Sequence, residues 1–188
     1  MLTHKGTQTI ETPRLILRKA ELSDAEDMYR NWASSPEVTK FLTWPAYASP
    51  DTARERLQIW QEEYASPENY QWMIVPKDLG QTIGTISVVE LDNRIQKAEI
   101  GYCIGSAWWH RGYTSEALSA VINFLFGEVG FQRIAARHDT NNPHSGAVMQ
   151  KCGMRYEGTL RQADWNNQGV CDEAIYSLLR SEWTGKEK

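Results

Sequence analysis

Apolar residues recur along this chain with two periods, which divide it into short strands and amphipathic helices. Alternation of apolar and polar residues predicts a half-buried strand, whereas apolar residues three and four positions apart predict one face of a helix. Strands are predicted at residues 14–18, 70–76, 82–90, 97–104, 133–138, 154–160 and 170–179. Helices are predicted at residues 23–33, 50–65, 114–127 and 143–151.

Boundary signals support several of these elements. Residues 23–26 (SDAE) have the form of a capping box, which predicts a helix start there. Pro50 follows Ser49 at the start of the second helix, and Gly153 closes the last one. The turn-like run 77–80 joins two strands, so these two and the strand at 97–104 are expected to form an antiparallel meander.

The order of elements predicts one mixed α/β domain over residues 1–188, with helices on both faces of the sheet and frayed ends at 1–12 and 184–188. A hydrophobic content of 41% and a charged content of 23% are typical of a globular protein. We expect no membrane segment, because no apolar run approaches the roughly 20 residues needed. The first residues lack the apolar block of a signal peptide, and the three cysteines have no metal-ligand spacing. These features favour a reducing, cytoplasmic location without a metal.

The charge balance bears on possible partners. A net charge of −4 argues against nucleic-acid binding, which needs a basic face, and fits a cationic small molecule or a basic peptide. Residues 41–47 (FLTWPAY) form an apolar, aromatic loop that is expected to cover or line a pocket together with the helix at 50–65.

Residues 107–117 (AWWHRGYTSEA) carry the most specific chemical signal. They connect a predicted buried strand to the start of a strongly periodic helix, and a glycine lies close to that start. Such a joint presents unpaired backbone N–H groups at the positive end of the helix dipole, which favours binding of phosphate groups. The alternative is a plain connection capped by polar side chains.

Six segments in order then resemble the GNAT acetyltransferases, in the branch named for enzymes that acetylate the N-termini of ribosomal proteins. They are residues 11–18 (ETPRLILR), 98–102 (AEIGY), 110–117 (HRGYTSEA), 142–145 (NPHS), 151–154 (KCGM) and 157–158 (EG). The resemblance implies a single GNAT-like α/β domain with a mixed, mostly antiparallel central sheet that is splayed in the middle. It also implies acetyl-CoA as donor, a primary amine as acceptor and a possible homodimer.

The resemblance assigns the binding of CoA to two segments and one asparagine. The phosphate loop comprises Trp109, His110, Arg111, Gly112, Tyr113 and Thr114. The family has Gln or Arg where this chain has Trp109, and Gly or Ala where it has Thr114. The backbone of Tyr102, Cys103 and Ile104 is expected to bind the pantetheine arm in the splay, with little contribution from the side chains. Asn142 is expected to contact the pantetheine, to cap the following helix, or to do both.

The reaction needs a group that takes a proton from the amine and a donor for the leaving thiolate. Glu99 and Asp164 are the two candidates for the base; Asp164 stands where the branch carries a glutamate, and its shorter side chain favours a water relay. The alternative roles are a solvent-facing strand residue for Glu99 and a turn residue for Asp164. The family often places a tyrosine at the position of Met149 as thiolate donor, so the resemblance points instead to Ser145, whose alternative is an ordinary residue of the first helical turn.

The expected function is therefore transfer of an acetyl group from acetyl-CoA to a primary amine, directly and within a ternary complex. The acceptor favoured by the resemblance is a protein N-terminal amine. A covalent route is disfavoured because no cysteine stands at a helix start beside a histidine. The rivals are a small-molecule amine acetyltransferase acting on a polyamine or aminoglycoside, and a non-catalytic acyl-CoA-binding domain. An ATP enzyme would need a lysine after the glycine and an acid for Mg²⁺, and the loop has neither.

Overall fold

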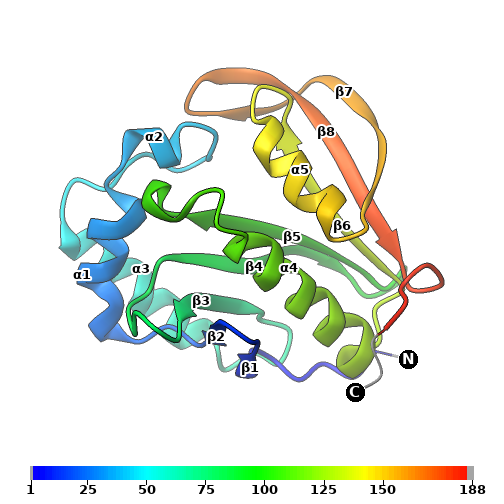
Figure 1. Cartoon of the computed structure of the whole chain (residues 1–188), viewed down its shortest axis with the longest axis horizontal. Helices are drawn as coiled ribbons and strands as arrows, with labels where there is room; N and C mark the ends of the chain where they lie inside the picture. Colours follow the sequence, from blue (N-terminus) through cyan, green and yellow to red (C-terminus); the bar gives the residue numbers. More distant parts are fainter. Residues whose placement is uncertain (1, 186–188) are drawn as a thin grey trace.

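A computed structural model describes residues 2–185, and their eight strands form one continuous sheet (Figure 1). The strands are β1 (Ile10–Glu11), β2 (Leu15–Arg18), β3 (Gln71–Pro76), β4 (Gly84–Asp92), β5 (Lys97–Ile104), β6 (Arg133–Asp139), β7 (Arg155–Asn166) and β8 (Gly169–Leu179). Their order is β1-β2-β3-β4-β5-β6-β8-β7, and β5–β6 is the parallel pair in an otherwise antiparallel sheet. The mixed sheet and the β3-β4-β5 meander confirm the predicted fold class.

Of the five α-helices in the described residues, four agree with the prediction in place, with one correction at a boundary, whereas the second was not predicted. The five are α1 (Ala25–Met28), which continues as a wider π-type turn through Ala33, α2 (Pro36–Thr39), α3 (Pro50–Glu63), α4 (Tyr113–Phe124) and α5 (Pro143–Lys151). The capping box predicted between Ser23 and Glu26 is wrong. The Asp24 carboxylate accepts from the Glu21 backbone N–H at 2.8 Å, because its pairing with Arg18 turns it back toward that residue. Among residues 2–185, no helix is both long enough and apolar enough to cross a membrane.

The sheet is buried on both faces where helices cover it. All six residues of β3 are buried, and they divide between two cores: Trp72 and Ile74 pack with α4, whereas Met73 and Val75 pack with α1 and α3. This double burial follows from the period of two along a strand. Helices cover both faces of the sheet, as predicted, and β5 and β6 lie in its middle (Figure 1).

The N-terminal residues do not fray as the sequence suggested. The Thr3 N–H donates to the Val129 carbonyl at 2.9 Å, and the Gly6 N–H donates to the Pro67 carbonyl at 2.7 Å. Satisfied backbone groups of this kind tie a terminus to the fold. At the other end, residues 186–188 of the predicted frayed tail lie outside the described residues.

An ion pair joins the three strands at the C-terminal side of the sheet and makes their stability depend on pH. Arg133 on β6 donates to Glu157 on β7 at 2.8 Å, and the Ser177 hydroxyl on β8 donates to the same carboxylate at 2.6 Å. The bond from Arg133, followed by that from Ser177, lowers the pKa of Glu157 to about 2. The pair therefore stabilises the fold above about pH 4.5, and this contribution is lost as the pH falls toward 2.

Replacement of Glu157 by glutamine is expected to lower the free energy of unfolding at pH 7 by no more than about 1 kcal/mol, since the carboxylate is partly exposed. The difference in stability between the variant and the wild type should narrow below about pH 4.5, be clearly smaller at pH 3 and close only near pH 2. Urea titrations at pH 7, 5 and 3 measure the difference. A gap of the same size at all three values would contradict the assignment to the ionised carboxylate.

Candidate acetyl-CoA and amine site

The two central parallel strands separate after three residue pairs. β5 pairs with β6 at Lys97–Arg133, Ala98–Ile134 and Glu99–Ala135, and within residues 2–185 the remainder of this β5 edge has no partner strand. The predicted splay is therefore present. From residue 100 onward, the edge of β5 offers backbone donors and acceptors to an extended ligand.

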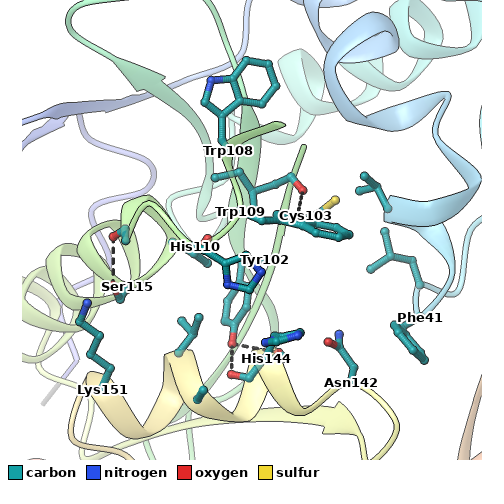
Figure 2. A pocket seen from close by; sticks show the side chains of 18 residues that line it. Phe41, Tyr102, Cys103, Trp108, Trp109, His110, Ser115, Asn142, His144 and Lys151 are labelled. Carbon is teal, nitrogen blue, oxygen red and sulfur yellow. Dashed lines mark hydrogen bonds between the residues drawn. The ribbon is translucent and has the colours of Figure 1, made fainter. Parts of the chain in front are cut away.

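A cavity of about 320 Å³ lies at this separation (Figure 2). Its walls come from the end of β5, the loop and first turn of α4, α5, and the segment around α2. They are formed by Val38, Phe41, Leu42, Tyr102, Cys103, Ile104, Trp108, Trp109, His110, Gly112, Thr114, Ser115, Asn142, His144, Ser145, Ala147, Val148 and Lys151. Most of the predicted CoA-binding residues are thus brought together, while Arg111 and Tyr113 are not part of the wall.

The start of α4 forms one end of the cavity and has the features of an anion site. Gly112 is the N-cap residue with φ of 79°, a left-handed conformation that glycine adopts without steric cost. Thr114 and Ser115 in the first turn face the cavity. Lys151, which the sequence analysis missed, also lies here: its Nζ is 3.8 Å from the point where a Cβ on Gly112 would stand. Helix amides and one ammonium group together suit a pyrophosphate.

Residues near the N-terminus hold this loop from outside the cavity. Arg14 pairs with Glu116 at 2.6 Å, donates to the Arg111 carbonyl at 3.0 Å and lies over the ring of Tyr113 at 4.6 Å. Burial opposes ionisation of Glu116, but hydrogen bonds from Thr12 and Arg14 outweigh it and lower the pKa of this carboxyl. The acid in the first turn of α4 is thereby neutralised by Arg14. Arg111 and Tyr113 thus support the loop in this structure.

Trp109 has a different contact from the one expected of a phosphate-loop residue. Its indole Nε1 donates to the Ile104 carbonyl at 2.9 Å, and its ring lies across the cavity next to Cys103 (Figure 2). One of the backbone acceptors expected to bind pantetheine is therefore already in use. Burial raises the pKa of the Cys103 thiol to about 12, so this cysteine is not a thiolate nucleophile.

The first turn of α5 carries the predicted thiolate donor into the cavity. Ser145 lines the wall, whereas Met149, one turn further on, is buried in the core. Asn142 is the N-cap residue but its side chain makes no capping bond, so it is available to a ligand at the cavity wall. The Tyr102 hydroxyl contacts Ser145, at 2.9 Å from the carbonyl and 3.0 Å from Oγ. A functional side chain at position 102 was not anticipated, since only its backbone was expected to matter.

The candidate bases lie on the other face of the sheet, outside the cavity wall. Glu99 is buried and pairs with Arg137 at 2.7 Å and with Lys97 at 3.2 Å. Arg137 also pairs with Glu173 at 3.0 Å, and burial raises the pKa of this second buried carboxyl. Asp164 belongs to β7 and not to a turn as its alternative interpretation held, and it adds to the negative charge around Glu173. The two carboxylate oxygens of Glu99 are thus each engaged in an ion pair, one with Arg137 and one with Lys97.

The histidines separate into two groups. His110 and His144 line the cavity with their rings in edge contact at 4.9 Å, and His110 has φ of 59°. His138 bonds the Asp139 carbonyl through Nδ1 at 2.7 Å and packs under Gly146 of α5, consistent with the structural role expected for it. In the described part of the chain, no group of three or more His, Cys, Asp or Glu side chains is arranged to hold a metal ion.

The tip of the β7–β8 hairpin fastens the aromatic loop over the cavity. The Asn167 N–H donates to the Leu42 carbonyl at 3.1 Å, and its side-chain amide donates to the carbonyls of Thr39 and Trp44, each at 2.8 Å. Leu42 and its neighbour Phe41 belong to the cavity wall, as the sequence analysis expected of this loop. The loop is therefore held in place by a residue more than 120 positions away.

Replacement of Asn167 by alanine is expected to release this loop at small cost to the fold, because two side-chain bonds at the surface are lost. The KM for the amine acceptor should rise about tenfold, whereas the dissociation constant for acetyl-CoA should change less than twofold. Steady-state kinetics and calorimetry measure the two effects. Replacement of the adjacent Gln168 by alanine is the matched control, since its side chain bonds only the Asn167 carbonyl within the described structure. An unchanged acceptor KM in the Asn167 variant would contradict the role of the hairpin.

Comparison with known proteins matches residues 14–155 to the acetyltransferase (GNAT) domain. The N-acetyltransferase YoaA of Bacillus subtilis is 33% identical over 171 residues, 91% of this chain and 96% of that protein. The ribosomal-protein-serine acetyltransferase of Escherichia coli is 28% identical over 143 residues, 73% of this chain and 76% of that protein. The structure of the microcin C7 self-immunity acetyltransferase MccE, solved with acetyl-CoA and AMP, shares the fold with a TM-score of 0.81 at 23% identity, covering 95% of this chain and 98% of that one.

The splayed sheet, with an open strand edge that leads to a helix N-terminus, fits the class of GNAT acetyltransferases that the family match gives. The matched domain spans more than half of the chain, and a relative above 30% identity covers nine tenths of it. The chain belongs to the GNAT acetyltransferase family, as the six sequence segments indicated, and it is an enzyme of that family.

Proposed function

We propose that this enzyme acetylates a protein N-terminal amine by direct transfer from acetyl-CoA. The main support for acetyl-CoA as the donor is that the open edge of β5 and the N-terminus of α4 meet in one cavity. Tyr102, Gly112 and Ser145 line this cavity. A pantetheine arm fits the strand edge, and its pyrophosphate fits the helix amides beside Lys151.

The reaction needs no covalent enzyme intermediate. The amine nitrogen attacks the thioester carbon, the C–S bond breaks, and its electron pair leaves on the CoA sulfur. A carboxylate first takes a proton from the substrate ammonium, so that the neutral amine attacks; we propose Asp164 acting through water for this role, because Glu99 is held in two ion pairs. The second proton leaves the nitrogen as the amide forms and passes to solvent. The Ser145 hydroxyl, which lines the cavity, stabilises the departing thiolate by a hydrogen bond.

Two observations support a protein N-terminal amine as the acceptor: the name of a related enzyme and the negative charge on one face of the sheet. The relative is the Escherichia coli enzyme, whose name gives ribosomal-protein serine as its target. The charge lies on the sheet face opposite α4, where Glu99, Glu173 and Asp164 outnumber the nearby cations Lys97 and Arg137. An excess of carboxylates favours an incoming ammonium group. The same charge fits a small cationic amine, which is the second candidate.

Calorimetric titration with acetyl-CoA, with ATP as control, tests the donor first. We expect micromolar affinity for acetyl-CoA and none for ATP. Release of CoA thiol is then followed with Ser- and Ala-starting peptides and with spermidine. Faster turnover of the peptides supports the proposed acceptor, turnover of spermidine alone supports the second candidate, and the absence of acetyl-CoA binding would refute the proposal.

A further inference from the structure

A pair of hydroxyl groups joins β5 to α5 inside the cavity. Tyr102 projects from β5 and Ser145 from the first turn of α5, and their side-chain oxygens lie 3.0 Å apart (Figure 2). The Tyr102 hydroxyl is also 2.9 Å from the Ser145 carbonyl, so its single hydrogen is shared between the carbonyl oxygen and the Oγ of the same residue. Both side chains line the cavity. The contact joins residues 43 positions apart, so it reflects the fold and not local geometry.

The direction of the serine hydrogen depends on this tyrosine. A serine in a helix otherwise tends to donate its hydroxyl hydrogen to a backbone carbonyl in the preceding turn. A hydroxyl carries one hydrogen and two lone pairs, so when Tyr102 donates to Ser145 Oγ, the serine hydrogen is free to point elsewhere. Burial raises the pKa of Tyr102 and outweighs the opposing effect of its bond to Ser145. The phenol therefore stays protonated, and able to donate, at neutral pH.

We propose that Tyr102 is a positioning residue that directs the Ser145 hydroxyl at the sulfur of the departing CoA. This inference rests on the proposed function, since it assigns a part in that reaction. As the thioester C–S bond breaks, its electron pair stays on sulfur and Ser145 donates a hydrogen bond to it. Tyr102 donates to Ser145 in turn, and chained hydrogen bonds of this kind strengthen one another. Neither hydroxyl loses its proton, and the protons of the amine leave by the separate routes to a carboxylate and to solvent.

A double-mutant cycle tests the inference, because residues that act as one unit are not additive. Tyr102→Phe keeps the ring in the core and is expected to lower kcat about tenfold, with the dissociation constant for acetyl-CoA changed less than twofold. Ser145→Ala is expected to lower kcat on the order of 100-fold. Addition of Tyr102→Phe to Ser145→Ala should then cause no further loss. The probe is a Ser-starting peptide or, if only the small amine reacts, spermidine.

Tyr176→Phe is the matched control for removal of a hydroxyl that faces the same helix. The Tyr176 hydroxyl contacts Gln150 on α5 at 3.4 Å and does not line the cavity, so kcat should stay within twofold of the wild type. Additive losses in the double variant, or an unchanged kcat in Tyr102→Phe, overturn the inference while the wild type remains an active acetyltransferase. A wild type that transfers acetyl to no amine overturns the proposed function and this inference with it.

Discussion

Replacement of Gly84 by alanine is expected to destabilise the protein by about 3–5 kcal/mol and to abolish acetyl-CoA binding where the variant still folds. Gly84 pairs with Ile104 across β4 and β5, and an added Cβ would clash with the Cys103 carbonyl oxygen and lie 2.8 Å from the Ile104 Cα. Both neighbours are backbone atoms, so the strands themselves must move. The displaced part of β5 is the part that lines the cavity.

Denaturant titration followed by fluorescence measures the loss of stability of the Gly84 variant, and calorimetry measures acetyl-CoA binding. Gly127→Ala is the matched control, because its Cβ would meet only the Trp183 ring at 3.5 Å, an ordinary contact. That variant should have wild-type stability within about 1 kcal/mol and full binding. A Gly84 variant as stable as this control would contradict the prediction, because it would show that β4 and β5 can move apart at Gly84 and Ile104 without loss of stability.

The sequence predicted the fold well because its strongest signals are local. A strand such as β3, with every side chain buried, carries a continuous apolar pattern, and helix α4 carries a regular apolar stripe. The capping box was predicted at residues 23–26 instead of between Glu21 and Asp24 for the opposite reason. Several acidic and hydroxyl residues compete near residues 21–26, and the choice was made by a side-chain contact from Arg18 on β2. Local patterns place elements, but tertiary contacts decide their ends.

The candidate site likewise contains some features that the sequence predicted and others that depend on tertiary contacts. The phosphate loop was visible because its glycine, its helix start and its preceding strand are contiguous in sequence. Lys151 and Glu173 were not visible in the sequence. Lys151 reaches the loop from the far end of α5, and Glu173 is linked to Glu99 only through Arg137. The contact of Trp109 with Ile104 was equally hidden, because it depends on how the loop folds back. A residue whose role depends on a partner distant in sequence carries no local signal.

Replacement of Gly112 by valine is expected to weaken acetyl-CoA binding on the order of 100-fold. Its φ of 79° is strained for any residue with a Cβ and most of all for a β-branched one. The added side chain would also lie between Arg14, 3.4 Å away, and Lys151, 3.8 Å away, over the amides that we assign to the pyrophosphate. Loss of one charge-assisted hydrogen bond of about 1.5–3 kcal/mol accounts for an effect of this size, since 100-fold corresponds to about 2.8 kcal/mol.

A second glycine with a left-handed backbone serves as a control that distinguishes the effect of backbone strain from the effect of covering the binding site. Gly80, in the turn between β3 and β4, has φ of 65° and no atom within 4 Å of its added Cβ, and it lies outside the cavity wall. Gly80→Val should therefore lose a similar amount of stability and keep wild-type affinity, when calorimetry is done at a temperature at which circular dichroism shows both variants folded. Equal loss of affinity in both would mean that backbone strain alone weakens binding. Loss confined to Gly112→Val would place the pyrophosphate against the first turn of α4, since the two substitutions differ chiefly in what the new side chain covers.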